Sequence, residues 1–88
     1  MPNEQSMMRV SVRFFSQLRE AAGASEEEVE LPASAEVADL LARLYQLHPG
    51  LEKWDRHLLI GVGLEFVERN YLLQPDEEIA LMPPVQGG

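Results

Sequence analysis

The stretch from Ser34 to Gly50, SAEVADLLARLYQLHPG, decides the fold, because it is the longest helical pattern in the chain. Ser34 is a suitable N-cap, and Glu36 is favourably placed near the positive end of the helix dipole. Pro49 and Gly50 should end the helix after His48. The apolar residues recur at helical spacing and form one stripe: Val37, Leu40, Leu41, Leu44 and Leu47. The pattern therefore predicts one amphipathic helix of about 13 residues whose stripe faces the core.

The chain before this helix predicts two strands. Met8 to Phe15 alternates, with Val10, Val12 and Phe14 on one face, and Phe15 falls on the opposite face by its parity. Glu26 to Leu31 alternates in the same way, and Pro32 should end it. Between them, residues 17–22 should form a short helix, with Ser16 as its cap and Gly23 as its left-handed stop. We expect residues 1–7, which are polar and aperiodic, to be a disordered leader.

The chain after the helix predicts short elements. Residues 51–56 should form a turn or a helical segment, and residues 57–62 and 64–67 two more strands. Residues 71–73 are apolar enough to fill part of the core, and residues 74–77 suit a turn. Residues 78–82 should form the last strand.

This order of elements predicts the fold class. A helix between strands favours a right-handed crossover that makes one pair of strands parallel. We expect an α+β domain over residues 8–82, a mixed sheet of four or five strands packed on one main helix. The first and last strands should be adjacent at its centre. This is a β-grasp (ubiquitin-like) arrangement.

Composition limits the classes of function. The 88 residues suit one domain, and an apolar fraction of 45% suits a folded one. A net charge of −8 argues against binding to nucleic acid or to an anionic membrane, and suits either a basic protein partner or simple solubility. The absence of cysteine excludes disulfides and a cysteine nucleophile. No stretch looks like a signal peptide or a membrane span, so we expect a cytoplasmic protein.

No catalytic or cofactor motif stands out. His48 and His57 lack the spacing of metal ligands, so we predict no metal site. Gly61-Val62-Gly63 lacks the third glycine and the following helix of a dinucleotide motif. We therefore expect no permanently bound cofactor.

The C-terminal residues Pro83-Pro84-Val85-Gln86-Gly87-Gly88 carry the chemistry that remains. Two prolines cannot continue a sheet ladder, so residues 83–88 should leave the sheet as an extended arm. Gly87 and Gly88 have no side chains, so the arm can enter a narrow channel and leave the terminal carbonyl unhindered. A carboxylate needs a better leaving group before it reacts, and adenylation by ATP supplies one. Attack by sulfur would then give a thiocarboxylate, and attack by an amine would give a protein conjugate.

Two parts of the chain resemble the molybdopterin synthase small subunit, a ubiquitin-like sulfur carrier. Residues 8–20, MRVSVRFFSQLRE, resemble its opening, and residues 80–88, ALMPPVQGG, resemble its close. The resemblance implies that an adenylating activating enzyme forms a transient acyl-adenylate on Gly88 from ATP, in that sense a nucleotide-binding step, and that a sulfur donor converts it to a thiocarboxylate. It further implies that the large synthase subunit accepts the arm in a complex of two small and two large subunits. There sulfur would pass to cyclic pyranopterin monophosphate in molybdenum cofactor biosynthesis. The chain would then be a co-substrate, with the pterin site in the other subunit.

Strand parity predicts where partners dock. If Val10, Val12 and Phe14 face the helix, Phe15 faces outward, and by the same alternation Met82 and Phe66 do so too. Phe15, Phe66 and Met82 should form an exposed apolar patch beside the arm, of the kind that marks interfaces. These positions match hydrophobic contact positions in the family. With the arm residues Pro83, Pro84, Val85 and Gln86, they are the predicted partner-binding residues.

Three other functions remain open from the sequence. One is the smaller sulfur carrier of the thiamine pathway, which the Pro-Pro pair and the greater length disfavour. Another is a ubiquitin-like modifier that conjugates through Gly88 to lysines. The third is a binding module whose terminal glycines are inert. Deleting Gly88 separates the third from the others, because a binding module should not depend on it.

Overall fold

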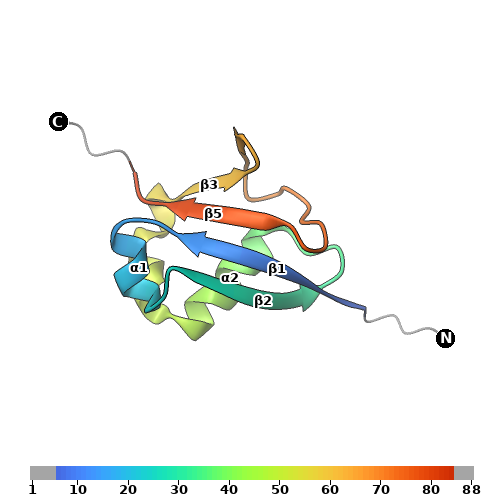
Figure 1. Cartoon of the computed structure of the whole chain (residues 1–88), viewed down its shortest axis with the longest axis horizontal. Coiled ribbons are helices and arrows are strands. Elements are labelled where there is room, and N and C mark those ends of the chain that lie inside the picture. Colours follow the sequence, from blue (N-terminus) through green and yellow to red (C-terminus); the bar gives the residue numbers. More distant parts are fainter. Residues whose placement is uncertain (1–5, 85–88) are drawn as a thin grey trace.

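The computed structural model describes residues 6–84, and its elements follow the predicted order (Figure 1). The elements are strand β1 (Met7–Phe14), helix α1 (Gln17–Ala22), strand β2 (Glu26–Pro32), helix α2 (Val37–Leu47), the 3₁₀ helix η1 (Pro49–His57), and strands β3 (Leu59–Val62), β4 (Glu65–Phe66) and β5 (Glu78–Met82). Among the described residues, no helix is long and apolar enough to cross a membrane.

The strands form one mixed five-stranded sheet in the order β2-β1-β5-β3-β4. β1 and β5 are parallel and adjacent, and the remaining neighbours are antiparallel. Figure 1 shows α2 crossing one face of this sheet, while the other face is left without a helix. The predicted α+β, β-grasp fold, with its first and last strands side by side, is confirmed.

The core lies between α2 and the sheet face that it covers. Alternate residues of β1 and β5 point into it, as do four members of the predicted helical stripe. The fully or almost fully buried residues from these elements are Val10, Val12, Phe14, Ile79, Leu81, Val37, Leu40, Leu41 and Leu44. The fifth stripe residue, Leu47, is 41% exposed because it lies in the last position of the helix. Among residues 6–84, no polar or charged residue is buried, so the core is held by apolar contacts.

The start of α2 corrects the prediction that Ser34 is the N-cap. Ser34 has a φ of 76° and lies in a turn, and the helix has 11 residues beginning at Val37. Glu36 is the N-cap, and its backbone N–H donates to Asp39 Oδ2 at 2.8 Å in a reciprocal capping box. The reason is tertiary, because Glu36 is extended and pairs with Leu72 in an isolated β-bridge.

Ser16 occupies the N-cap position of α1, as predicted, but its side chain does not cap the helix. Ser16 has a φ of 54° and makes no side-chain capping bond, whereas a capping residue needs extended backbone. The predicted stop is confirmed, since Gly23 has a left-handed φ of 74° and its N–H donates to the carbonyl of Arg19 at 2.8 Å.

Several predicted boundaries shift by one or two residues. β1 begins at Met7, which the prediction assigned to the leader, and ends at Phe14; residues 1–5 lie outside the described part. β3 begins at Leu59 because η1 continues through His57. β4 has only two residues, because Leu64 belongs to the turn that Gly63 makes with a φ of 62°.

Candidate functional site

The site predicted from the sequence starts where β5 leaves the sheet. On the β1 side, the Phe15 N–H donates to the carbonyl of Leu81 there at 3.1 Å. Pro83 and Pro84 follow at once, have no N–H to donate, and are half-buried. The predicted arm residues Val85, Gln86, Gly87 and Gly88 lie outside the described residues.

Phe15, Phe66 and Met82, the predicted apolar patch, are all near this end of the sheet. Phe14 is the register partner of Leu81, so the next step along both strands places Phe15 beside Met82. On the other side, Leu59 pairs with Met82, and Gly61 pairs with Phe66. The exposed fraction is 38% for Phe15 and 68% for Phe66, while Met82 is half-buried.

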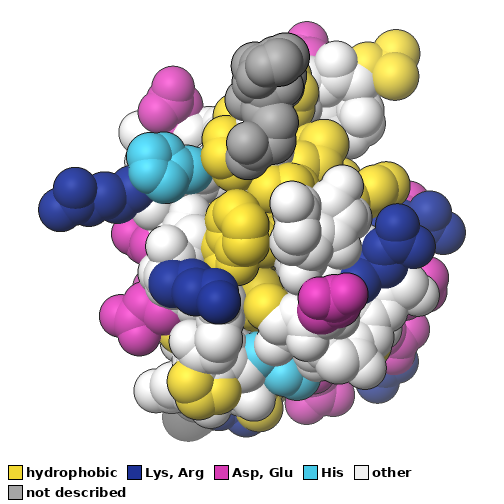
Figure 2. Space-filling view, turned by 90° about the vertical axis from the view of Figure 1, so that its left-hand side faces the viewer, with side chains coloured by type: hydrophobic (Ala, Val, Ile, Leu, Met, Phe, Trp, Pro, Cys, Tyr) yellow, Lys and Arg dark blue, Asp and Glu magenta, His cyan; other side chains and the backbone are white. Residues whose placement is uncertain are grey.

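Gly61 explains why Met82 is only half-exposed. The Met82 methyl carbon lies 3.3 Å from the position that a Cβ on Gly61 would occupy. The methionine side chain therefore extends across the glycine toward the strand that carries Phe66. Figure 2 views the end of the molecule where β5 stops and shows hydrophobic side chains gathered there in a continuous strip.

Two further apolar residues adjoin the patch and were not predicted as site residues. Leu64, at the tip of the turn between β3 and β4, is 104% exposed, and Leu59 is half-buried beside Met82. The sequence did offer a signal for Leu64, because this residue is apolar and directly follows a glycine that suits a turn. Leu59 depends on the β3–β5 register, which the sequence does not reveal.

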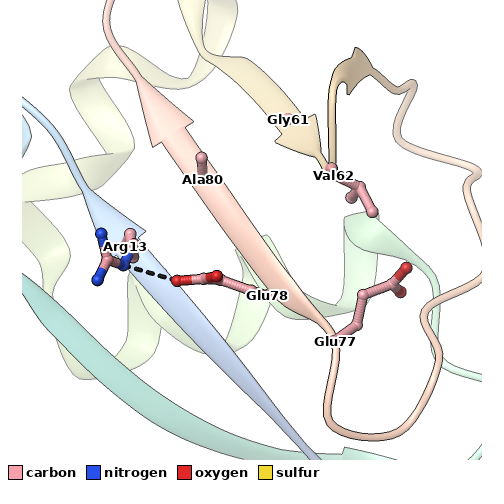
Figure 3. Close-up of a pocket in the computed structure, with 7 residues that line it drawn as sticks. Arg13, Gly61, Val62, Glu77, Glu78 and Ala80 are labelled. Atoms are coloured by element: carbon pink, nitrogen blue, oxygen red, sulfur yellow. Dashed lines mark ion pairs between the residues drawn. The ribbon is translucent and has the colours of Figure 1, made fainter.

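The sheet face opposite α2 is hollowed beside the patch. A hollow of about 480 Å³ lies over Gly61 and Ala80, which face each other across β3 and β5 (Figure 3). Its other lining residues are Arg13, Val62, Gly63, Glu77 and Glu78. In Figure 3, Glu78 reaches toward Arg13, and Arg13 Nε and Glu78 Oε2 form an ion pair 2.6 Å apart.

The remainder of this face is charged. Arg9 lies 3.8 Å from Glu28 and 3.6 Å from Glu30, and Arg13 lies 3.7 Å from Glu26. All these side chains are more than half exposed, so each pair adds little to stability. These acidic residues belong to β2, which is an edge strand of the sheet.

Tyr45, Asp55 and Arg69 form a cluster that joins α2, η1 and the segment after β4 and that shifts the pKa values of its members. The Tyr45 hydroxyl donates to Asp55 Oδ1 at 2.5 Å, and Arg69 Nη1 donates to the same oxygen at 2.9 Å. Burial, followed by this bond to Asp55, raises the pKa of Tyr45. The bond from Tyr45, followed by that from Arg69, lowers the pKa of Asp55. Because every member is engaged by another, the cluster fixes η1 in place rather than offering a catalytic acid or base.

The two histidines do not form a site. His48 Nε2 lies 2.6 Å from Glu27 Oε1, and its ring meets the edge of Phe14 at a centroid distance of 6.4 Å. His57 is exposed at the end of η1. Within residues 6–84, no group of three or more His, Cys, Asp or Glu side chains is placed to hold a metal ion.

Comparison with known proteins places the chain among small carrier proteins. The ThiS family matches residues 12–88, which includes the C-terminal glycines. The molybdopterin synthase sulfur carrier subunit of Chlamydomonas reinhardtii is 32% identical over 83 residues, covering 92% of this chain and 100% of the relative. The human protein of the same name is 31% identical over 85 residues, covering 93% of this chain and 97% of the relative.

Solved structures share the fold. SAMP1, the small archaeal modifier protein 1 of Haloferax volcanii, superposes with a TM-score of 0.79 at 28% identity and covers 91% of this chain and 99% of its own. A chain from the complex of subunits 1 and 2 of the molybdopterin-converting factor of Helicobacter pylori superposes with a TM-score of 0.63 at 30% identity. That match covers 92% of this chain and 100% of the other.

Proposed function

The chain belongs to the ThiS family, and on that basis we propose that it is the sulfur carrier subunit of a molybdopterin synthase. The observation that carries this proposal is the similarity to sulfur carrier subunits over more than nine-tenths of the chain, in a family match that continues to Gly88. The structure supports it, because the central strand β5 leads directly into the Pro-Pro pair beside an exposed apolar patch.

The chemistry takes place on the Gly88 carboxylate. A carboxylate oxygen attacks the α-phosphorus of ATP in the active site of an adenylating enzyme, and pyrophosphate leaves. Hydrosulfide supplied by a sulfur donor then attacks the acyl carbon, the bond to AMP breaks and AMP leaves, and loss of the sulfur's proton gives the thiocarboxylate. Gly87 and Gly88 have no Cβ, so neither step is hindered at the acyl carbon. ATP is consumed in this step and is not a resident cofactor of the chain.

The fold holds the arm in position for its partners and takes no part in the chemical steps. β5 is held between β1 and β3, so pulling on the arm is resisted by ladder bonds on both sides. The apolar patch of Phe15, Phe66 and Met82 docks first on the activating enzyme and then on the large synthase subunit, while residues 83–88 enter each active site. In the large subunit the thiocarboxylate sulfur passes to cyclic pyranopterin monophosphate. The working complex contains two small and two large subunits and acts in the cytoplasm.

Reconstitution tests this proposal. The chain, thiocarboxylated with its activating enzyme, ATP and a sulfur donor, is mixed with the large subunit and cyclic pyranopterin monophosphate, and molybdopterin formation is measured. We expect product in proportion to the thiocarboxylate supplied and none from a chain lacking Gly88. Formation of product without thiocarboxylate would contradict the proposal.

A second function is favoured by one observation, the similarity to small archaeal modifier protein 1. A modifier would use the same adenylate but transfer Gly88 to a lysine amine. Peptide mapping of proteins cross-linked to this chain in its own cells distinguishes the two, since only a modifier leaves Gly88 in isopeptide linkage. The thiamine-pathway carrier predicts sulfur transfer without the large synthase subunit, and an inert binding module predicts no modification of Gly88.

A further inference from the structure

The hollow over Gly61 and Ala80 continues along the outer face of the sheet. A second hollow, of about 260 Å³, shares Gly61, Gly63 and Ala80 with the first. Its remaining lining residues are Leu64, Glu65, Phe66 and Met82. The two hollows therefore form one trough with a floor of Gly61 and Ala80, called here the outer trough. One end is bounded by the apolar patch and the other by Arg13, Glu77 and Glu78.

The glycine in the floor is explained by space rather than by backbone conformation. Gly61 lies within β3 and does not adopt a positive φ, unlike Gly23 and Gly63. A Cβ at this position would meet the Met82 methyl at 3.3 Å and the Ala80 Cβ at 3.8 Å. The first contact is with the end of a flexible side chain and the second is ordinary, so the strand tolerates a larger residue. The absence of a side chain instead keeps the floor low, with only the flexible end of Met82 lying over it.

The charged end of the trough has an excess of carboxylates. Glu77 and Glu78 line it against one cation, Arg13, which already pairs with both Glu78 and Glu26. Glu77 is held in place, because it accepts a bond from the Tyr71 hydroxyl at 2.7 Å and one from the Gln74 N–H at 2.9 Å. The whole chain carries a net charge of −8. A small apolar floor that ends among fixed carboxylates suits a side chain with an apolar stem and a cationic head.

We propose that the outer trough receives one lysine or arginine side chain of the large synthase subunit. The aliphatic stem crosses Gly61 and Ala80, and the cation lies between the carboxylates of Glu77 and Glu78. The apolar patch supplies most of the affinity for the large subunit. The cation in the trough fixes how the two subunits align, because it can be held at only one place. The inference rests on the proposed function, since it assigns the chemistry of that partner's contact.

Two matched variants test whether the trough carboxylates contribute to binding of the large subunit. Glu78→Gln removes a trough carboxylate and one exposed ion pair, whereas Glu30→Gln removes an equally exposed carboxylate and its pair with Arg9, outside the trough. The dissociation constant for the recombinant large subunit of the same organism is measured for each by calorimetry at low and at high salt. We expect Glu78→Gln to weaken binding about tenfold at low salt and to reduce the salt dependence, and Glu30→Gln to change binding less than about twofold.

Side chains added at Gly61 test whether the space above the trough floor is needed for binding. Gly61→Ala and Gly61→Val should weaken binding in that order, with about tenfold or more for valine, while circular dichroism shows that the melting temperature is kept. Because the chain has no cysteine, Glu65→Cys, at an exposed position beside the trough floor, also accepts a single photo-cross-linker, and we expect the captured large-subunit peptide to contain a lysine or arginine at the contact.

The outcomes separate this inference from the proposed function. If the wild-type chain does not bind the large subunit, the proposed function fails, and this inference fails with it. If the wild-type chain binds and Glu78→Gln equals Glu30→Gln, or Gly61→Val binds as tightly as the wild type while folded, the proposed function stands. In that case only the basic side chain in the trough is refuted.

Discussion

Truncating Phe66 should separate partner binding from folding. Phe66 is 68% exposed, so about 140 Å² of a side chain of about 200 Å² is free for a partner to cover. At about 25 cal/mol per Å², complete covering would contribute about 3.5 kcal/mol. Because interfaces cover such residues incompletely and truncation lets neighbours relax, we expect Phe66→Ala to lose about 2 kcal/mol of binding, or about thirtyfold in the dissociation constant.

The cost to the fold should be smaller. About a third of Phe66 is covered within the chain, which sets an upper limit of about 1.5 kcal/mol on the loss of unfolding free energy. Calorimetry with the large subunit measures binding, and urea unfolding measures stability.

Leu72→Ala is the matched control, because Leu72 is 53% exposed but lies outside the apolar patch, in the bridge to Glu36. It should leave binding within about twofold. Binding by Phe66→Ala within about threefold of the wild type would refute the assignment of the patch as the docking surface.

Other predictions concern the scaffold. Leu81→Ala, at a 1% exposed position in the central strand, should cost about 3 kcal/mol of unfolding free energy in urea, and a loss below about 1 kcal/mol would mean that the core collapses around it. Asp76→Gly should gain about 0.5 kcal/mol, since Asp76 has a φ of 65° and the bond from its N–H to Arg9 needs no side chain; a loss would show that the carboxylate matters. Asp55→Asn should cost about 1 kcal/mol near neutral pH, a modest value because the carboxylate is 40% exposed. Because the pKa of Asp55 is lowered on folding, its contribution is present above its unfolded pKa of about 3.9 and fades as the pH falls below it. The difference between the wild type and Asp55→Asn in unfolding experiments should therefore shrink as the pH falls below about 3.9, and a constant difference would contradict this.

Local patterns predicted the fold well where they were long and regular. The alternation of Val10, Val12 and Phe14 and the helical stripe from Val37 to Leu44 are the buried faces of β1 and α2. The start of α2 failed because it depends on a bridge between Glu36 and Leu72, residues far apart in the chain. Sequence preference for serine at a cap was overridden by this tertiary pairing.

The candidate site could also be predicted where local alternation determines it, but not where the pairing of distant residues does. Parity alone placed Phe15, Phe66 and Met82 on the face away from α2. The outer trough could not be predicted in this way, because it depends on Gly61 lying beside Ala80 across β3 and β5. In the sequence, Gly61 was considered only as part of Gly61-Val62-Gly63, and its place in the floor of the trough appears once the register is known.

The most direct test of the account is the chemical state of Gly88. The chain is isolated from its own cells, its intact mass is measured, and its C-terminal peptide is fragmented. We expect that a fraction of the chains carries sulfur in place of one oxygen on Gly88 and that this fraction disappears when the activating enzyme is removed. A carboxylate that stays unmodified in cells, and after incubation with ATP, a sulfur source and the activating enzyme, would contradict the claim that the chain is a sulfur carrier.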